Sequence, residues 1–385
     1  MRSIVGSPPR GEDFLPRPEV INRIYRKLGT SHIYLSAPRR VGKTAVMRHL
    51  EDYPKENFEF KYIITQACES PIEFYKLLME SVLSFRSLSA TTVSALKGFL
   101  NSIASIDIIG NGIKLKEQEI NYQKECKAIF SNLQTNGKKV VIMIDEFTQT
   151  IDNIWKTHSH STASSFLFAN REIQATTSEN IKFIYTGSLG LQSLCTRMGV
   201  SDALNYLNVV DLGPLSADEA KELASKVLHN AGVEYDQDVI EEIITGLAYL
   251  IPFHIQLVIQ ELIEKWDENG TIINKADVLK ALITVTDRRS NHYFEHYHNH
   301  IKKAYDSGPS YDFILHFLTE LSQVDLLDHD QVSSMSEQFG VKKQLNNIIG
   351  FLEYDGYIYA DRNKKPTIYR FTAPILKLWW GRNMT

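Results

Sequence analysis

The chain has 385 residues, of which 43% are hydrophobic, 10% aromatic and 23% charged, a composition that is typical of folded globular proteins and excludes disordered, collagen-like and coiled-coil rod proteins. It contains no run of about 18 apolar residues and no apolar leader at its start, so we expect a cytoplasmic protein with neither a membrane span nor a secretion signal. The net charge of −4 gives no overall attraction to nucleic acid, and the three widely spaced cysteines favour reduced thiols.

Strands and helices alternate over the first part of the chain. We predict strands at 32–36, 58–67, 140–144, 181–185 and 207–212. Parallel strands need crossover helices, so this alternation predicts an α/β domain over residues 1–214, with a parallel sheet flanked by helices. Apolar residues on either side of Gly110-Asn111-Gly112 predict a β-hairpin insertion near 106–116.

The pattern after residue 214 is helical. Ser216 followed by Glu219 is a capping box that begins the first of several helices, and these predict a small helical lid domain over 215–288. The last segment, 289–385, has the outline of a winged-helix domain. Its predicted elements are helices near 290–304, 311–323, 330–338 and 341–353, and strands at 357–360 and 367–371.

The first predicted strand leads into the sequence APRRVGKT at 37–44, and a helical pattern follows. Phosphate binding needs backbone N–H groups, a helix N-terminus, a flexible cation and a hydroxyl group for a metal ion. Gly42 permits the tight turn, Lys43 is predicted to reach the β- and γ-phosphates, and Thr44 to ligate Mg²⁺. The GxxxxGK[ST] pattern has Gly where this chain has Ala37, a small residue that can be tolerated there; the alternative is a chance GKT at a helix start.

The predicted nucleotide contacts in this loop are Pro38, Arg39, Arg40, Val41, Gly42, Lys43, Thr44 and Ala45. For the two arginines, phosphate contact and an exposed position both remain open.

The most apolar run of the chain, 140–144, ends in Asp145 and Glu146. We predict a buried strand neighbouring the phosphate loop, with Asp145 holding Mg²⁺ together with Thr44 and with Glu146 orienting or deprotonating the attacking water. The alternative is that the two acids only mark a strand end. Together with Lys43, these residues predict a site for ATP and Mg²⁺.

Four segments resemble, in this order, the archaeal-type ATPases related to the STAND and AAA+ groups: the phosphate loop, the strand VVIMIDEF, the strand ending FIYTGS and the segment LGPLSADEA. The resemblance covers roughly residues 11–265, and a C-terminal winged helix is usual in that family. It implies a polar sensor of the γ-phosphate at Ser188 or at Thr186 beside it. It also implies that Phe14 to Arg17 line the adenine and that Pro252 and His254 lie near the base or the phosphates.

The resemblance leaves some residues open. The family tends to have Gly where this chain has Leu250, and a partly buried core histidine is the alternative for His254. A charge-stabilising arginine is not fixed by any motif, and Arg171 and Arg197 are interpreted as surface residues. His292, His296 and His300 share one helical face, for which we favour a polar, aromatic interdomain helix over a zinc site.

These observations favour an ATP-binding, slowly hydrolysing switch whose nucleotide state controls domain arrangement and the binding of a protein partner or self-association, without a membrane partner. The alternative is a DNA-associated ATPase whose winged helix places Lys342, Lys343, Gln344 and Asn347 in the major groove. Because residues 291–385 carry slightly more acidic than basic side chains, a protein or intramolecular role is preferred for that domain. A scaffold that binds nucleotide without hydrolysing it is the third possibility.

Overall fold

The computed structural model describes residues 1–109, 122–187 and 190–384. The chain forms two compact units that interleave along the sequence. The sheet unit comprises Pro16–Ser36 and Lys43–Leu212, and the helical unit comprises Met1–Leu15, Ala37–Gly42 and Gly213–Thr385. The predicted division into three domains stays a prediction. None of the helices in the described ranges is both long and apolar enough to cross a membrane.

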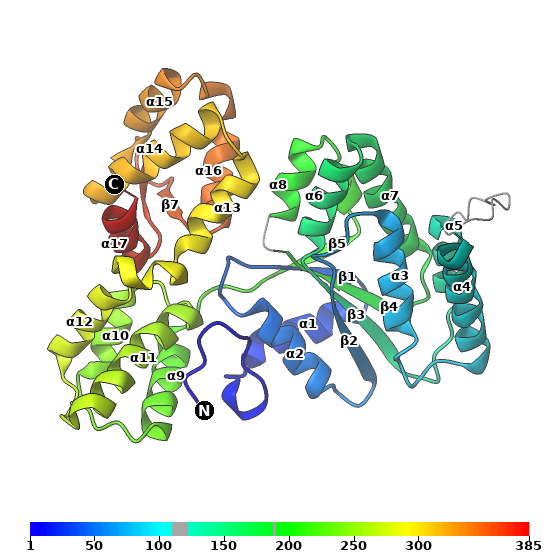
Figure 1. Cartoon of the computed structure of the whole chain (residues 1–385), viewed down its shortest axis with the longest axis horizontal. Helices are drawn as coiled ribbons and strands as arrows, with labels where there is room; N and C mark the ends of the chain where they lie inside the picture. The colour runs from blue at the N-terminus through cyan, green and yellow to red at the C-terminus, as the bar shows by residue number, and fades with distance from the viewer. Residues whose placement is uncertain (110–121, 188–189, 385) are drawn as a thin grey trace. The chain divides into compact units, whose positions relative to one another are not determined.

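A five-stranded parallel sheet forms the centre of the sheet unit, as the alternating pattern predicts (Figure 1). Its strand order is β2-β3-β4-β1-β5. The strand bounds are β1 His32–Ser36, β2 Phe58–Ile64, β3 Lys139–Asp145, β4 Ile181–Tyr185 and β5 Leu207–Asp211. All five predicted strands are therefore present, with β2 ending three residues earlier than expected.

The strand order is a feature that the sequence pattern did not predict. The strand that carries Asp145 is not the immediate neighbour of the strand before the phosphate loop, because β4 lies between β3 and β1. The pairing of β3 with β4 continues past the strand ends, where the N–H of Thr186 donates to the carbonyl of Ile144 and the N–H of Phe147 to the carbonyl of Thr186. The end of β4 is thereby fixed beside the end of β3, where Asp145 lies.

Helices cover both faces of this sheet (Figure 1). Their bounds are α1 Pro18–Leu28, α2 Lys43–Asp52, α3 Pro71–Val82, α4 Ala90–Ile109, α5 Tyr122–Asn132, α6 Phe147–Thr157, α7 His160–Thr176 and α8 Leu191–Arg197. Helices α1 and α2 lie on one face, and α3, α5, α6 and α7 enclose the main apolar core on the other. Val140, Ile142 and Ile144 of β3 are fully buried in that core.

The hairpin expected near 106–116 is wrong in its first part. Residues 106–109 form the last turn of α4, and the rest of the predicted hairpin lies outside the described residues. A short apolar run does not distinguish a strand from a buried helix by its periodicity, and here the helix that begins at Ala90 continues through it.

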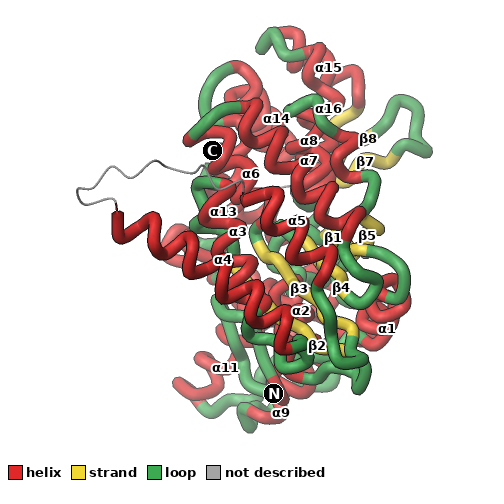
Figure 2. The backbone as a smooth tube through the Cα atoms, turned by 90° about the vertical axis from the view of Figure 1, so that its right-hand side faces the viewer, coloured by secondary structure: helices red, strands yellow, loops and turns green. Residues whose placement is uncertain are grey.

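The β5 edge of the sheet is covered by cations from α1. Lys27 Nζ donates to the carbonyl of Val209 at 2.7 Å, and the Arg23 guanidinium to the carbonyl of Asp211 at 2.8 Å. Figure 2 shows the strands of the sheet side by side with helices packed around them. Charged side chains on an exposed edge discourage the addition of a further strand.

The helical unit contains the remaining elements. Its first helices are α9 Ala217–Asn230, α10 Val239–Leu247, α11 Pro252–Asn269 and α12 Lys275–Thr284. The predicted capping box is present, since the Ser216 hydroxyl accepts from the N–H of Glu219 at 3.1 Å and the Glu219 carboxylate accepts from the N–H of Ser216 at 2.8 Å.

The C-terminal part has the predicted order of four helices followed by two strands. Its elements are α13 Glu295–Tyr305, α14 Pro309–Gln323, β6 Leu327–Asp328, α15 His329–Gln338, α16 Leu345–Tyr354, β7 Ile358–Asp361, β8 Ile368–Phe371 and α17 Pro374–Asn383. The strand β6, which the sequence analysis does not include, joins β8 and β7 in an antiparallel sheet of order β6-β8-β7. Trp379 and Trp380 of α17 are buried in its core.

Candidate functional site

The phosphate-loop segment lies between β1 and α2, as its sequence predicts. Gly42 has a φ of +105°, a backbone conformation that residues with a Cβ atom rarely adopt, and Arg40 has a φ of +65°. Where right-handed and left-handed backbone conformations alternate, successive N–H groups point to the same side of the chain, which is the geometry of anion-binding loops. Ala37 is buried, so its methyl group is accommodated where the motif has glycine.

Thr44 and Asp145 are in direct contact, although 101 residues separate them along the chain. The Thr44 hydroxyl at the start of α2 donates to Asp145 Oδ2 at 3.0 Å. Asp145, the last residue of β3, is 4% exposed. The structure thus brings together the hydroxyl and the carboxylate that were predicted to share a metal ion.

Two further donors hold the Asp145 carboxylate. The Tyr62 hydroxyl from β2 donates to Oδ2 at 2.6 Å, and the N–H of Glu146 donates to Oδ1 at 3.0 Å. Burial raises the pKa of Asp145, and the hydrogen bonds from Tyr62 and Thr44, with the charge of Lys43, oppose that rise. A buried carboxylate next to a hydroxyl group offers two oxygen donors of the kind that Mg²⁺ binds.

Tyr62 is a site residue that sequence reasoning missed. Its side chain is buried, and burial, followed by the charge of Asp145, raises the pKa of its hydroxyl above its ordinary value. The sequence does contain a signal for it: a tyrosine lies inside a buried strand, two residues before the strand ends. A buried tyrosine hydroxyl needs a hydrogen-bond partner, so a polar group was to be expected near it. The sequence does not show that the partner would be Asp145, since that contact depends on β2 pairing with β3.

Glu146 has a left-handed backbone conformation, with φ 58° and ψ 31°. It is the N-cap residue of α6, and its side chain is half-buried. Residues other than glycine rarely adopt this conformation, and such residues occur at functional sites. The turn at Glu146 directs the chain from β3 into α6, a helix that the sequence analysis does not include.

The end of β4 carries the predicted sensor. The Thr186 side chain is fully buried, and its hydroxyl has no hydrogen-bond partner among the described residues. Ser188, the other sensor candidate, lies outside the described residues. A Cβ atom added to Gly187 would lie 2.0 Å from the Thr148 hydroxyl oxygen on α6, so a side chain at this position would collide with the helix that follows Glu146.

Several predicted nucleotide contacts belong to the helical unit. The guanidinium carbon of Arg40 lies 4.4 Å from the centre of the Phe253 ring, a cation–π contact. Desolvation there, with the charge of Arg39, lowers the pKa of Arg40. Pro252 begins α11, and Phe14 is buried. Pro38 and Arg39 are half-buried and Val41 is buried.

His254 has the environment of a packed histidine. Its side chain is fully buried, and its ring lies 5.5 Å from the Phe294 ring. Burial, with the nearby charge of Arg40, lowers the pKa of His254 to about 3, so the ring is neutral at pH 7. The role that the resemblance implies for it stays a prediction.

The other candidates are placed as follows. In the sheet unit, Arg17 and Ala45 are buried, Lys43 is half-buried, and Arg171 Nη1 lies 3.4 Å from Asp202 Oδ2. Gly42, in the helical unit, is also half-buried. His300 is buried beside Asp355, with Nδ1 3.4 Å from the carboxylate. Across the described ranges, no group of three or more His, Cys, Asp or Glu side chains is arranged to hold a metal ion.

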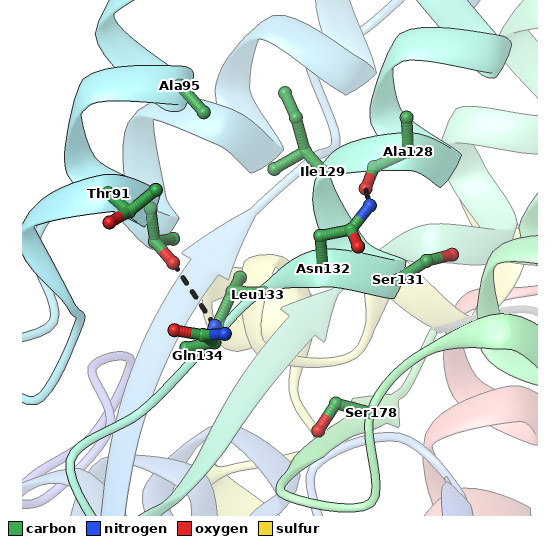
Figure 3. Close-up of a pocket in the computed structure, with 10 residues that line it drawn as sticks. Thr91, Ala95, Ala128, Ile129, Ser131, Asn132, Leu133, Gln134 and Ser178 are labelled. Atoms are coloured by element: carbon green, nitrogen blue, oxygen red, sulfur yellow. Dashed lines mark hydrogen bonds between the residues drawn. The ribbon is translucent and has the colours of Figure 1, made fainter.

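A hollow of about 620 Å³ lies beside α4 and α5 in the sheet unit (Figure 3). It is lined by neutral side chains and contains none of the predicted site residues. Two hydrogen bonds cross its lining: the backbone N–H of Gln134 donates to the Thr92 hydroxyl, and the Asn132 amide donates to the carbonyl of Ala128.

The parallel sheet has the order β2-β3-β4-β1-β5, and its strand β1 leads into a Gly-Lys-Thr turn. Strand β3 ends in a carboxylate that is hydrogen-bonded to that threonine. Together these features define a P-loop NTPase fold. Residues 16–187 match the family model described as a predicted AAA-ATPase. This match supports nucleotide binding by an AAA+ P-loop ATPase.

Two solved structures share the fold over nearly their whole length. A Walker-type ATPase of Pyrococcus abyssi matches with a TM-score of 0.65 at 15% identity, over 99% of each chain. The Aeropyrum pernix ORC2 protein, solved as ADPNP–ADP complexes, matches with a TM-score of 0.55 at 12% identity, over 97% of this chain and 96% of that one. A search of curated proteins gives no match. At these identities the likeness shows the fold.

Proposed function

We propose that this protein binds ATP with Mg²⁺ and hydrolyses it slowly, as a switch of the archaeal-type group related to the STAND and AAA+ ATPases. The observation that carries the proposal is the 3.0 Å contact between the Thr44 hydroxyl and the Asp145 carboxylate, at the start of the helix that follows the Gly42 turn. A hydroxyl and an acid in contact beside a phosphate loop are the protein ligands that a nucleotide-bound Mg²⁺ requires.

The residues divide the work by their chemistry. Lys43 binds the outer phosphates, and Thr44 and Asp145 hold the metal ion, which when bound neutralises the charge of the phosphates. Glu146 orients the attacking water or removes its proton. Thr186, whose hydroxyl is buried, or alternatively Ser188, senses the γ-phosphate. The left-handed backbone conformation of Glu146 supports this assignment, because residues in such uncommon conformations cluster at functional sites.

The path of the chain supports a role as a switch. Residues 37–42 pack with the helical unit, whereas Lys43 and Thr44 pack with the sheet unit, so the chain passes from one unit to the other within the phosphate-binding motif. A ligand held by Lys43 and Thr44 binds next to the point at which the chain leaves the helical unit. Binding and hydrolysis then favour different arrangements of the units and of whatever partner they bind.

Binding and hydrolysis are tested with Lys43→Ala and Glu146→Gln. We expect Lys43→Ala to lose ATP affinity in calorimetry, and Glu146→Gln to bind ATP but to lose hydrolysis by about 100-fold or more. Lys226→Ala and Glu222→Gln are the matched controls, because this exposed pair lies outside the site. Equal ATP affinity of Lys43→Ala and the wild type would refute the site assignment, whereas ATP binding without turnover in the wild type would indicate a non-hydrolysing scaffold.

A DNA-associated ATPase is the second candidate, and the surface of α16 favours it. We interpret α14 to α16 with the antiparallel strands as a winged helix, in which α16 and the short helix before it form the DNA-reading element. Gln344, Asn346 and Asn347 are exposed on one stretch of that element, and Lys343 is exposed beside them. Amide side chains can bond the edge of adenine in the major groove.

Duplex DNA separates the two candidates. If DNA raises the rate of ATP hydrolysis, and Gln344→Ala with Asn347→Ala removes that effect while leaving the rate without DNA unchanged, the DNA-associated function is correct. An unchanged rate, with no DNA binding in fluorescence anisotropy at low salt, leaves the switch with a protein partner.

A further inference from the structure

A closed set of contacts connects Asp145 to the helix that follows the phosphate loop. The Tyr62 hydroxyl donates to Asp145 Oδ2, and the guanidinium carbon of Arg48 on α2 lies 3.8 Å from the centre of the Tyr62 ring. Arg48 also bonds Glu51 at 2.9 Å, and Glu51 accepts from the backbone N–H of Tyr62 at 3.0 Å. Tyr62 is therefore held at its ring, its backbone and its hydroxyl, by one turn of α2 and by the strand β3.

Thr44 and Tyr62 bond the same carboxylate oxygen, but they differ in what else they can do. A bound metal ion takes a lone pair of the Thr44 oxygen, so this hydroxyl has to serve the metal ion and Asp145 at once, whereas the Tyr62 hydroxyl serves Asp145 alone. Tyr62 is fixed by its other contacts, so its hydroxyl stays available to Oδ2. Donors that orient a metal-binding carboxylate determine how well the metal is held.

We propose that Tyr62, held by Arg48 and Glu51, is a positioning residue that fixes the orientation of the Asp145 carboxylate for the nucleotide-bound metal ion. This inference rests on the proposed function and adds to it a residue outside the phosphate loop and the acid pair. It also gives α2 two links to the metal site, one through Thr44 and one through the Arg48, Glu51 and Tyr62 contacts.

The test measures metal affinity rather than turnover. Mn²⁺, as a paramagnetic substitute for Mg²⁺, is titrated into the full chain saturated with ADP, and free Mn²⁺ is followed by electron paramagnetic resonance. We expect Tyr62→Phe to weaken Mn²⁺ binding by about 10- to 100-fold. Its affinity for ADP in the presence of EDTA should stay within about twofold of the wild type, because the tyrosine hydroxyl donates to Asp145, which is expected to hold the metal ion and not the nucleotide.

Tyr25→Phe is the matched control. The Tyr25 hydroxyl accepts a hydrogen bond from the N–H of Lys55 at 3.0 Å, and Lys55 Nζ lies 4.4 Å from the centre of its ring. This tyrosine therefore has the same two kinds of contact as Tyr62, but it lies on α1 and bonds no carboxylate. Tyr25→Phe should lower the melting temperature and leave Mn²⁺ affinity unchanged.

A second pair of variants keeps the inference testable if Tyr62→Phe does not fold. Arg48→Met removes the cation over the ring and the ion pair with Glu51, and it should weaken Mn²⁺ binding in the same direction. Arg48→Lys keeps a cation there and should restore most of the affinity. Mn²⁺ affinity within twofold of the wild type in folded Tyr62→Phe, or in both Arg48 variants, would overturn this inference alone. Failure of the wild type to bind Mn²⁺ with ADP would overturn the proposed function, and the inference with it.

Discussion

The left-handed residue Glu146 should reverse the usual order of stability between alanine and glycine. At an ordinary helical position glycine is less stable than alanine by about 1 kcal/mol. At a φ of 58° the Cβ atom of alanine costs about 1–2 kcal/mol, whereas glycine adopts this conformation without that cost. After subtraction of the larger entropy that glycine loses on folding, about 0.5–1 kcal/mol, Glu146→Gly should be more stable than Glu146→Ala by roughly 0.5–1 kcal/mol.

The comparison is made by urea unfolding followed by circular dichroism, without nucleotide. Both variants lack the Glu146 carboxylate, so their difference reports the backbone and not the lost side chain. The control is the pair Gln149→Ala and Gln149→Gly, in the first turns of the same helix, α6. Both of these lose the bond from the Gln149 amide to Asn153, and here alanine should be the more stable. An alanine variant at 146 as stable as the glycine variant would refute the claim of strain.

Three more predictions concern the sheet unit. Gly187→Ala should lower the free energy of unfolding by roughly 1–3 kcal/mol, because the new Cβ atom would lie 2.0 Å from Thr148 Oγ1. Thr148→Ala in the same chain should recover part of that loss, as measured by urea unfolding. Burial lowers the pKa of His32 to about 4. The free energy of unfolding should therefore have its full value above pH 6.5 and fall by about 3 kcal/mol as the pH decreases to 4. His32→Asn should flatten this dependence on pH, and equal slopes in the variant and the wild type would contradict the prediction. Burial raises the pKa of Cys68 to about 11 and that of Cys195 to about 12. A thiol reagent at pH 7.5 should therefore label both cysteines slowly in the native protein and fully in urea. Rapid labelling of the native protein would contradict this, because it would show that these thiols are accessible.

Local sequence signals predicted the parts of the site that depend on neighbouring residues. The strand 32–36, the turn at Gly42 and the helix that begins at Lys43 form one continuous segment, and each was predicted from its own pattern. The contact of Thr44 with Asp145 followed from combining two such segments.

The sequence could not show which strands pair. Nothing local indicates that β4 lies between β1 and β3, or that β2 brings Tyr62 to Asp145, because strand order depends on contacts between residues far apart in the chain. Helix α6 was missed although Phe147, Ile151 and Ile154 have helical spacing, since its threonines have low helix propensity. The resemblance placed His254 near the nucleotide, whereas its burial depends on packing with Phe294.

The interleaving of the two units along the chain affects how the protein can be divided. The backbone passes between them after Leu15, Ser36, Gly42 and Leu212, so neither unit is a contiguous piece of sequence. A fragment that stops at Leu212 would keep residues 1–15 and 37–42 but lose the residues they pack with. Truncation at that point therefore removes support from the phosphate loop itself, and single-residue variants of the full chain are the sounder way to assign roles to each part.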